Sequence, residues 1–157
     1  MKTRMLCAVM LVLMLSMLLS ACETETPPTV TPLPEPAVLY GQIAEKTTLP
    51  AMVTLTADEL YDVIGIDPAW YSASAAYFAA DGTAPDEILI FLAVDEAAAE
   101  SLVSVLGTRL QYKQDSASQY LTENQPMLES GVVRRDGLTV SLLVAADMDA
   151  VEGCYPE

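Results

Sequence analysis

Histidine is absent from the 157 residues, and basic residues are scarce, with 7 Lys and Arg against 22 Asp and Glu. Without histidine the chain cannot form a Ser-His-Asp triad, a Cys-His pair or a histidine metal site. Nucleic-acid binding is also unexpected, because phosphate contacts require clustered Lys and Arg and the formal net charge is −15. Gly-rich phosphate loops, Gly-x-Ser-x-Gly elbows and Cys-x-x-Cys pairs are missing as well. We therefore expect no enzyme activity, no cofactor and no bound metal.

The N-terminal segment has the order of features of a bacterial lipoprotein signal. Two basic residues precede an almost uninterrupted apolar run over residues 5–19, which has the length of a signal peptide and is short for a membrane span. A Leu-Ser-Ala-Cys sequence ends at Cys22 and resembles the lipobox, in which the cysteine sulfur is joined to diacylglycerol. We predict a signal peptide over residues 1–21, cleavage between Ala21 and Cys22, and lipidation of Cys22. The alternatives are an uncleaved anchor helix and an ordinary secreted protein.

The segment that follows the predicted cleavage site has the composition of a tether. Residues 22–39 contain five prolines, separated mainly by Thr and Glu, and too little apolar surface to form a core. Removing 21 of 157 residues would leave 136, with five basic and 22 acidic side chains and a charge of −17. An anionic bilayer repels such a domain, while two acyl chains anchor it stably. We expect a lipid-anchored protein at the extracytoplasmic face of the cell membrane, standing off the bilayer.

Residues 40–153 are expected to form a single domain that contains several amphipathic helices. Thr56 and Glu59 have the spacing of a capping box, which predicts a helix beginning there. Asp95 can cap a long helix with apolar residues at helical spacing to about Gln114. Shorter helices are predicted at residues 42–47 and 147–152.

Four segments have the composition of β-strands, and a turn joins the last two. They cover residues 71–80, 87–94, 131–135 and 138–144. The run 87–94 is nearly all apolar, as in a central strand covered on both faces. Asp136-Gly137 between two β-rich runs predicts a tight hairpin. The sequence therefore predicts an α+β fold, a four-stranded antiparallel sheet from two hairpins in the order α-β-β-α-β-β-α, with helices packed on a face.

A series of short motifs spread over this domain points to a family. In chain order they are Ile43-Ala44-Glu45-Lys46, Leu49-Pro50-Ala51-Met52, Tyr61, Gly65-Ile66-Asp67-Pro68, Ala84-Pro85-Asp86-Glu87-Ile88 and Val94-Asp95-Glu96-Ala97-Ala98. The series resembles the domain of unknown function (DUF) 4358 family, small lipoproteins found mainly in Gram-positive anaerobic bacteria. The resemblance covers about residues 42–152. The family has no established activity, so the resemblance implies no catalytic residues.

Two pairs of neighbouring residues are candidates for partner contact. Trp70 and Tyr71 follow a proline at a predicted strand start, where an exposed aromatic pair could bind a glycan or a protein. The alternative is that this pair anchors the core. Arg134 and Arg135 could receive an acidic partner, or they could be charged residues that block edge-to-edge strand pairing.

Acidic residues and one cysteine are the other groups that could take part in catalysis or metal binding. Neighbouring carboxylates occur at Asp58-Glu59, Asp86-Glu87 and Asp95-Glu96. General acid–base catalysis needs two carboxyls that face one cleft with separated pKa values, and we interpret these pairs as solvated surface groups or helix caps. Asp147-Met148-Asp149 with Glu152 could offer oxygen ligands to Ca²⁺ but lacks the EF-hand pattern. Cys154 would be left without an intramolecular partner.

Two function classes follow from these observations. The first is a non-catalytic binding or scaffolding module that contacts an unknown protein or ligand of the cell envelope. The second is a small carboxylate-based hydrolase or a solute-capture protein. The lack of histidine and of nucleophile motifs favours the first class.

Overall fold

The computed structural model describes residues 33–156, so the predicted signal peptide, Cys22 and most of the predicted tether lie outside the described residues. Two 3₁₀ turns, Pro68–Trp70 and Thr122–Asn124, accompany the regular elements. In chain order these elements are α2 (Pro36–Lys46), β1 (Met52–Thr54), α3 (Ala57–Ile64), β2 (Tyr71–Ala79), β3 (Glu87–Ala93), α4 (Glu96–Tyr120), α5 (Gln125–Ser130), β4 (Val132–Asp136), β5 (Thr139–Val144) and α6 (Met148–Glu152).

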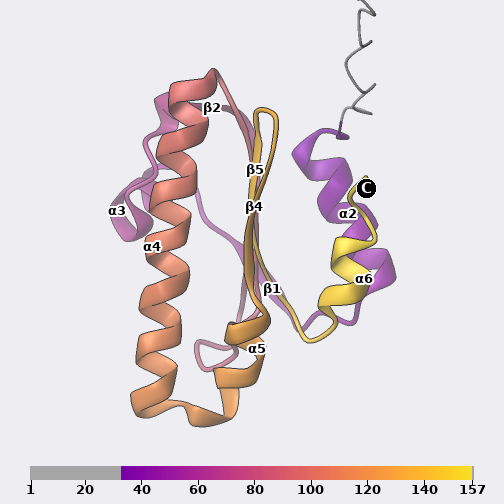
Figure 1. Ribbon diagram of the computed structural model, residues 1–157, viewed down its shortest axis with the longest axis vertical. Coiled ribbons are helices and arrows are strands. Elements are labelled where there is room, and N and C mark those ends of the chain that lie inside the picture. The colour runs from indigo at the N-terminus through magenta and orange to yellow at the C-terminus, as the bar shows by residue number, and fades with distance from the viewer. Residues whose placement is uncertain (1–32, 157) are drawn as a thin grey trace, which may run out of the picture. The chain divides into compact units, whose positions relative to one another are not determined.

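The strands form one antiparallel sheet in the order β1-β2-β3-β5-β4. The α+β class is confirmed, but the prediction of four strands is wrong, because β1 pairs with β2 through Met52 and Ala79. Three residues are too few to show the alternation by which a strand is recognised in a sequence. The helices also cover both faces of the sheet rather than one, with α3 and α4 on one side and α2 and α6 on the other (Figure 1).

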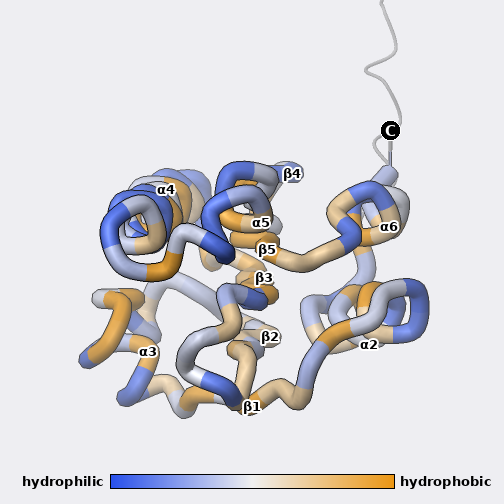
Figure 2. The backbone as a smooth tube through the Cα atoms, turned by 90° about the horizontal axis from the view of Figure 1, so that it is seen from below, coloured by the Kyte–Doolittle hydropathy of each residue, from blue (hydrophilic) through white to orange (hydrophobic). Residues whose placement is uncertain are grey.

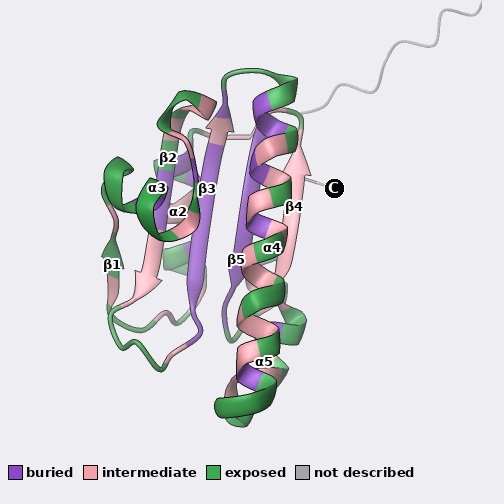
Figure 3. Ribbon diagram, turned by 90° about the vertical axis from the view of Figure 1, so that its left-hand side faces the viewer, coloured by how far each residue is buried: buried purple, intermediate pink, exposed green. Residues whose placement is uncertain are grey.

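Alternation along the central strands divides the core into two layers. Leu89 and Phe91 of β3 point toward α3, α4 and α5, whereas Ile88 and Ile90 point toward α2 and α6. Figure 2 shows the two helical layers with the sheet between them. Because both faces are covered, β3 and β5 are almost entirely buried (Figure 3). The prediction of a doubly covered central strand at residues 87–94 is confirmed for residues 87–93, whereas Val94 lies beyond the strand and is exposed.

Local sequence signals place several element boundaries. The capping box is confirmed, since Thr56 accepts from the Glu59 amide and Glu59 accepts from the Thr56 amide. Gly65 ends α3 in the left-handed region, with φ of 84°. Asp95 caps α4, as predicted. Gly137, with φ of 60°, occupies the tight turn between β4 and β5, which confirms the hairpin. The turn lies one residue later than predicted, because Asp136 ends β4 and pairs with Thr139.

Two helices are longer than their sequence patterns indicate. Helix α2 begins at Pro36, so the last residues assigned to the tether are helical. Proline is suited to the first helical turn, and burial of Leu39 and Ile43 holds this helix against the sheet. Helix α4 reaches Tyr120, six residues beyond Gln114. Within residues 33–156, no helix has both the length and the hydropathy needed to cross a membrane.

The C-terminal residues are fastened to the sheet on the α2–α6 side. The Tyr155 hydroxyl donates to Ser141 Oγ over 2.9 Å, and both residues are buried. Burial is the main reason that the pKa of Tyr155 is raised to about 12. The Arg134 guanidinium lies 4.7 Å from the Tyr155 ring centroid and donates to the Pro156 carbonyl over 3.0 Å. These contacts close this face of the sheet.

Candidate functional site

Glu87, the first residue of β3, is fully buried on the face of the sheet that α4 covers. Strand alternation gives it the same orientation as Leu89 and Phe91, which belong to the core beneath α4. A carboxylate in such a place is costly unless cations and hydrogen bonds satisfy it. Arg109 and Lys113, one turn apart on α4, supply both.

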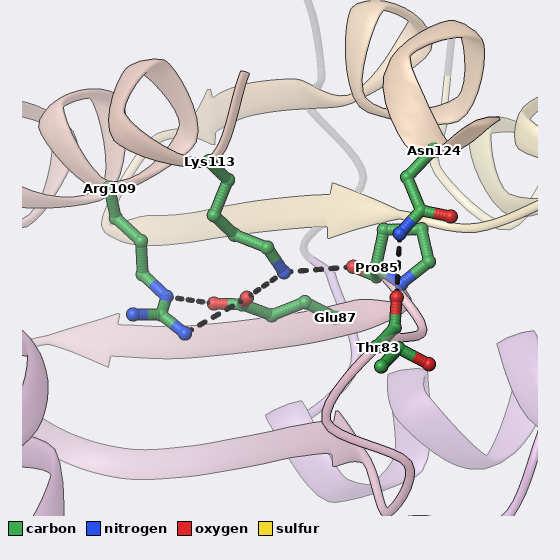
Figure 4. Close-up of polar contacts among 6 residues, drawn as sticks. All are labelled: Thr83, Pro85, Glu87, Arg109, Lys113 and Asn124. Atoms are coloured by element: carbon green, nitrogen blue, oxygen red, sulfur yellow. Dashed lines mark hydrogen bonds and ion pairs between the residues drawn. The ribbon is translucent and has the colours of Figure 1, made fainter. Parts of the chain in front are cut away.

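The three side chains form a closed ion cluster (Figure 4). Arg109 donates from Nε and Nη2 to the two Glu87 oxygens, with Nη2 3.1 Å from Oε2. Lys113 Nζ donates to Glu87 Oε2 over 2.6 Å and to the Pro85 carbonyl over 2.9 Å. The guanidinium also lies 5.3 Å from the centroid of the Phe78 ring. The cluster thus joins α4 to the start of β3 and to the preceding loop.

Burial of Asp86 and Glu87 contradicts the prediction that this pair is solvated at a strand edge. Desolvation is the main cause of a raised pKa at Asp86, and the charge of Lys113 offsets part of that shift. The cations lie more than 20 residues away along the chain, so local sequence context gives no sign of them. The other two carboxylate pairs contribute the helix caps, through Glu59 and Asp95.

An open cavity of about 350 Å³ lies between α3 and α4. We call it the α3–α4 groove; its lining residues are Val63, Ile64, Ser104, Val105, Thr108, Arg109 and Tyr112. Two large hydrophobic side chains are exposed at this groove, since Val63 is 63% exposed and Tyr112 is 70% exposed. Exposed apolar side chains that converge on one cavity are typical of binding surfaces.

A second, smaller cavity of about 110 Å³ adjoins the first under the loop between β2 and β3. Tyr112 lines both cavities, and Lys113 lines the smaller one. Asn124 Nδ2 donates to the Thr83 carbonyl over 2.6 Å, which ties this loop to the segment after α4 (Figure 4). The volume is below the roughly 300 Å³ at which ligand pockets begin, so the larger groove is the better candidate site.

The aromatic pair Trp70 and Tyr71, a candidate for partner contact or for a core anchor, does not line the groove. Trp70 and Tyr71 are half-buried and pack against the core on the α3–α4 side of the sheet. The Tyr71 ring meets the Phe91 ring edge-on, with centroids 5.1 Å apart. This placement favours the core-anchor alternative.

The two adjacent arginines are engaged in ion pairs within the chain. Arg134 Nε donates to Asp136 Oδ2 over 2.6 Å, and Arg135 donates to Glu96. Both arginines lie on the edge strand β4, where charge discourages pairing with another sheet. Neither lines the α3–α4 groove.

The remaining candidate residues lie near the C-terminus. Asp147 Oδ1 accepts from the Ala150 amide over 3.0 Å and caps α6, as predicted. Cys154 is half-buried, forms no disulfide among the described residues, and lies 3.5 Å from the Ala150 carbonyl oxygen. In the part of the chain that the structure describes, no three Cys, Asp or Glu side chains are grouped to hold a metal ion.

Fold and site together define a small α+β domain with a five-stranded antiparallel sheet between two helical layers and a groove on one of them. The model of the Domain of unknown function (DUF4358) matches residues 45–145, and the chain belongs to this family. The resemblance derived from the motifs is thereby confirmed for the domain. No curated protein and no solved structure matches the chain.

Sequence reasoning missed the ion cluster, although two signals for it are present. Counting back by two from the core residues Leu89 and Phe91 places Glu87 on the same face. Arg109 and Lys113 stand four residues apart, on one side of a helix that packs on that face.

Glu87→Gln should destabilise the domain by roughly 3 kcal/mol, because it leaves two cations against a neutral amide in a buried site. Urea unfolding of the purified variant measures this change. Glu100→Gln, an exposed position on the same helix α4, is the matched control and should change the stability by less than about 0.5 kcal/mol. Equal effects of the two substitutions would show that the cluster contributes nothing.

Proposed function

We propose that the protein is a non-catalytic binding module, held at the extracytoplasmic face of the cell membrane by diacylglycerol on Cys22. It captures a protein or ligand of the cell envelope in the α3–α4 groove. The convergence of exposed Val63 and Tyr112 on one open cavity is the observation that carries this proposal. Such side chains lose contact with water when a partner covers them, which favours association.

The chemistry of the groove supports binding rather than catalysis. The polar groups among its lining residues are three hydroxyls, of Ser104, Thr108 and Tyr112, together with the guanidinium of Arg109. Arg109 is bound to Glu87, a buried carboxylate that does not line the groove. A carboxylate-based hydrolase would need two acids facing a common substrate, whereas Glu87 is fully buried against cations.

Capture of a small solute is the second candidate, and the size of the groove favours it. A volume of about 350 Å³ falls at the lower end of the roughly 300–1,000 Å³ typical of small-molecule sites. The groove is bounded by only two helices, however, and its rim residues are largely exposed. This geometry suits the anchoring side chain of a larger partner better than an enclosed solute.

Anchoring rests on the N-terminal sequence, which supplies the signal features, the cysteine and the proline-rich spacer. Cys22→Ala should move the protein from the membrane fraction to the soluble fraction, because no diacylglycerol can be attached without the thiol. Fractionation of intact cells followed by immunoblotting measures the distribution. Retention of the variant in the membrane would contradict lipid anchoring and favour an uncleaved helix.

A photo-reactive residue in the groove should capture the partner in living cells. Tyr112→benzoylphenylalanine should give a discrete cross-linked product, and Tyr120→benzoylphenylalanine should not, because Tyr120 is 81% exposed but lies outside the groove lining. Mass spectrometry of the product would distinguish a protein from a small ligand. The same adducts at both positions would contradict a specific groove.

A second substitution tests whether the groove itself is required. Val63→Lys, introduced beside the Tyr112 cross-linker, should reduce the product at least tenfold, because a charge replaces an apolar rim contact. Val38→Lys is the matched control, since Val38 is 54% exposed and lies on α2, across the sheet. Equal yields in the two variants would exclude the groove as the docking site.

A further inference from the structure

The surface of α3 next to the groove carries a concentration of negative charge. Asp58 and Asp62 are exposed and stand four residues apart, on one side of this short helix. Together with Tyr61, Asp67 and Pro68 they line a shallow surface hollow of about 520 Å³. Tyr61 is 55% exposed. An apolar groove and an acidic, aromatic hollow therefore share the helix α3.

Part of the positive charge at the groove is offset from inside the domain, since Glu87 supplies one carboxylate for the two cations Arg109 and Lys113. Arg109 lines the groove, but two of its nitrogens are bound to Glu87. Lys113 is bound to the same carboxylate and lies close enough to influence Asp86. The exposed charges on α3 include those of Asp58 and Asp62, which line the hollow rather than the groove itself. An acidic occupant would be repelled there, and a cationic one attracted.

A second copy of this chain is a poor occupant for the same reason. The formal net charge of −15 causes two copies to repel each other, and repulsion of this kind keeps proteins monomeric. A partner that approaches α3 must carry the opposite charge. Charge complementarity of this kind mainly sets the specificity and the rate of association, while burial of apolar groups supplies affinity.

We infer that the groove binds a cationic segment of an envelope protein, in which an apolar side chain is flanked by Lys or Arg. This inference rests on the proposed function and specifies its partner. The apolar side chain inserts between Val63 and Tyr112, and the flanking cations face Asp58 and Asp62. The exposed Tyr61 ring adds a cation–π surface on the same side.

Two biotinylated peptides test the inference on the full chain in phosphatidylcholine nanodiscs. One peptide has a Leu-Phe-Leu centre flanked by two lysines on each side, and the other replaces every lysine by glutamate. With Tyr112→benzoylphenylalanine, the lysine peptide should label at least tenfold more strongly than the glutamate peptide, and labelling should fall as NaCl is raised. Tyr120→benzoylphenylalanine reports adventitious labelling. Equal labelling by the two peptides at position 112 would overturn the inference.

Removing the acidic groups isolates their contribution. Asp58→Asn with Asp62→Asn should lower labelling by the lysine peptide roughly three- to tenfold, since two exposed charge contacts are lost. The matched control, Glu45→Gln with Asp149→Asn, removes two exposed charges from α2 and α6 on the other face. Asp58 lies in the first turn of α3, where its removal could also weaken the helix. Asp62→Asn alone, in the middle of α3, tests the loss of charge without that effect. If the control pair lowered labelling by the same factor, the effect would come from the net charge of the protein and the inference would be overturned.

The outcomes separate the inference from the proposed function. If the lysine peptide is not preferred while Val63→Lys still abolishes cross-linking in cells, the groove binds a partner of another chemistry. If Val63→Lys and Val38→Lys behave alike in cells, the groove is not the docking site and both fail. Urea unfolding of each variant shows that a loss of labelling reflects binding rather than folding.

Discussion

Burial of the Glu87 carboxylate is the constraint on which the α4 side of this domain depends. Its exposed fraction is zero, so its charge is tolerated only because Arg109 and Lys113 reach it from α4. These contacts fix α4 against β3, and through the Pro85 carbonyl they also fix the loop that precedes β3. The seven residues that line the α3–α4 groove all come from these two helices. The shape of the groove therefore depends on the position in which the cluster holds α4.

The two faces of the sheet differ in a way that is consistent with the proposed anchored binding module. On one face, α2 and the C-terminal residues are packed closely, with Tyr155 bonded to Ser141. On the other, α3 buries little more than Leu60 and leaves apolar and acidic side chains exposed beside α4. The chain enters the domain through α2, which lies across the sheet from α3 (Figure 1). An N-terminal attachment therefore leaves the helices that form the groove uncovered by α2.

The sequence predicted features that depend on near neighbours and missed those that depend on distant ones. The capping box at Thr56, the cap at Asp95 and the turn at Gly137 each arise within a few residues and were predictable. Strand β1 was not predicted because it forms by pairing with β2, and its own three residues show no strand pattern in the sequence. The groove was equally invisible, since it requires knowing that α3 lies beside α4.

Hydrogen exchange of the backbone amides in Glu87→Gln, compared with the native protein, tests most directly whether the ion cluster holds α4 against the sheet. The account predicts that amides of residues 105–117 exchange at least tenfold faster, because opening of α4 from the sheet is what the cluster opposes. Amides of α2 and α6, on the other face, that exchange through local opening should accelerate much less, because such openings leave the cluster intact. The same acceleration in all three helices, or none in α4, would contradict the account, since the groove would then not depend on Glu87.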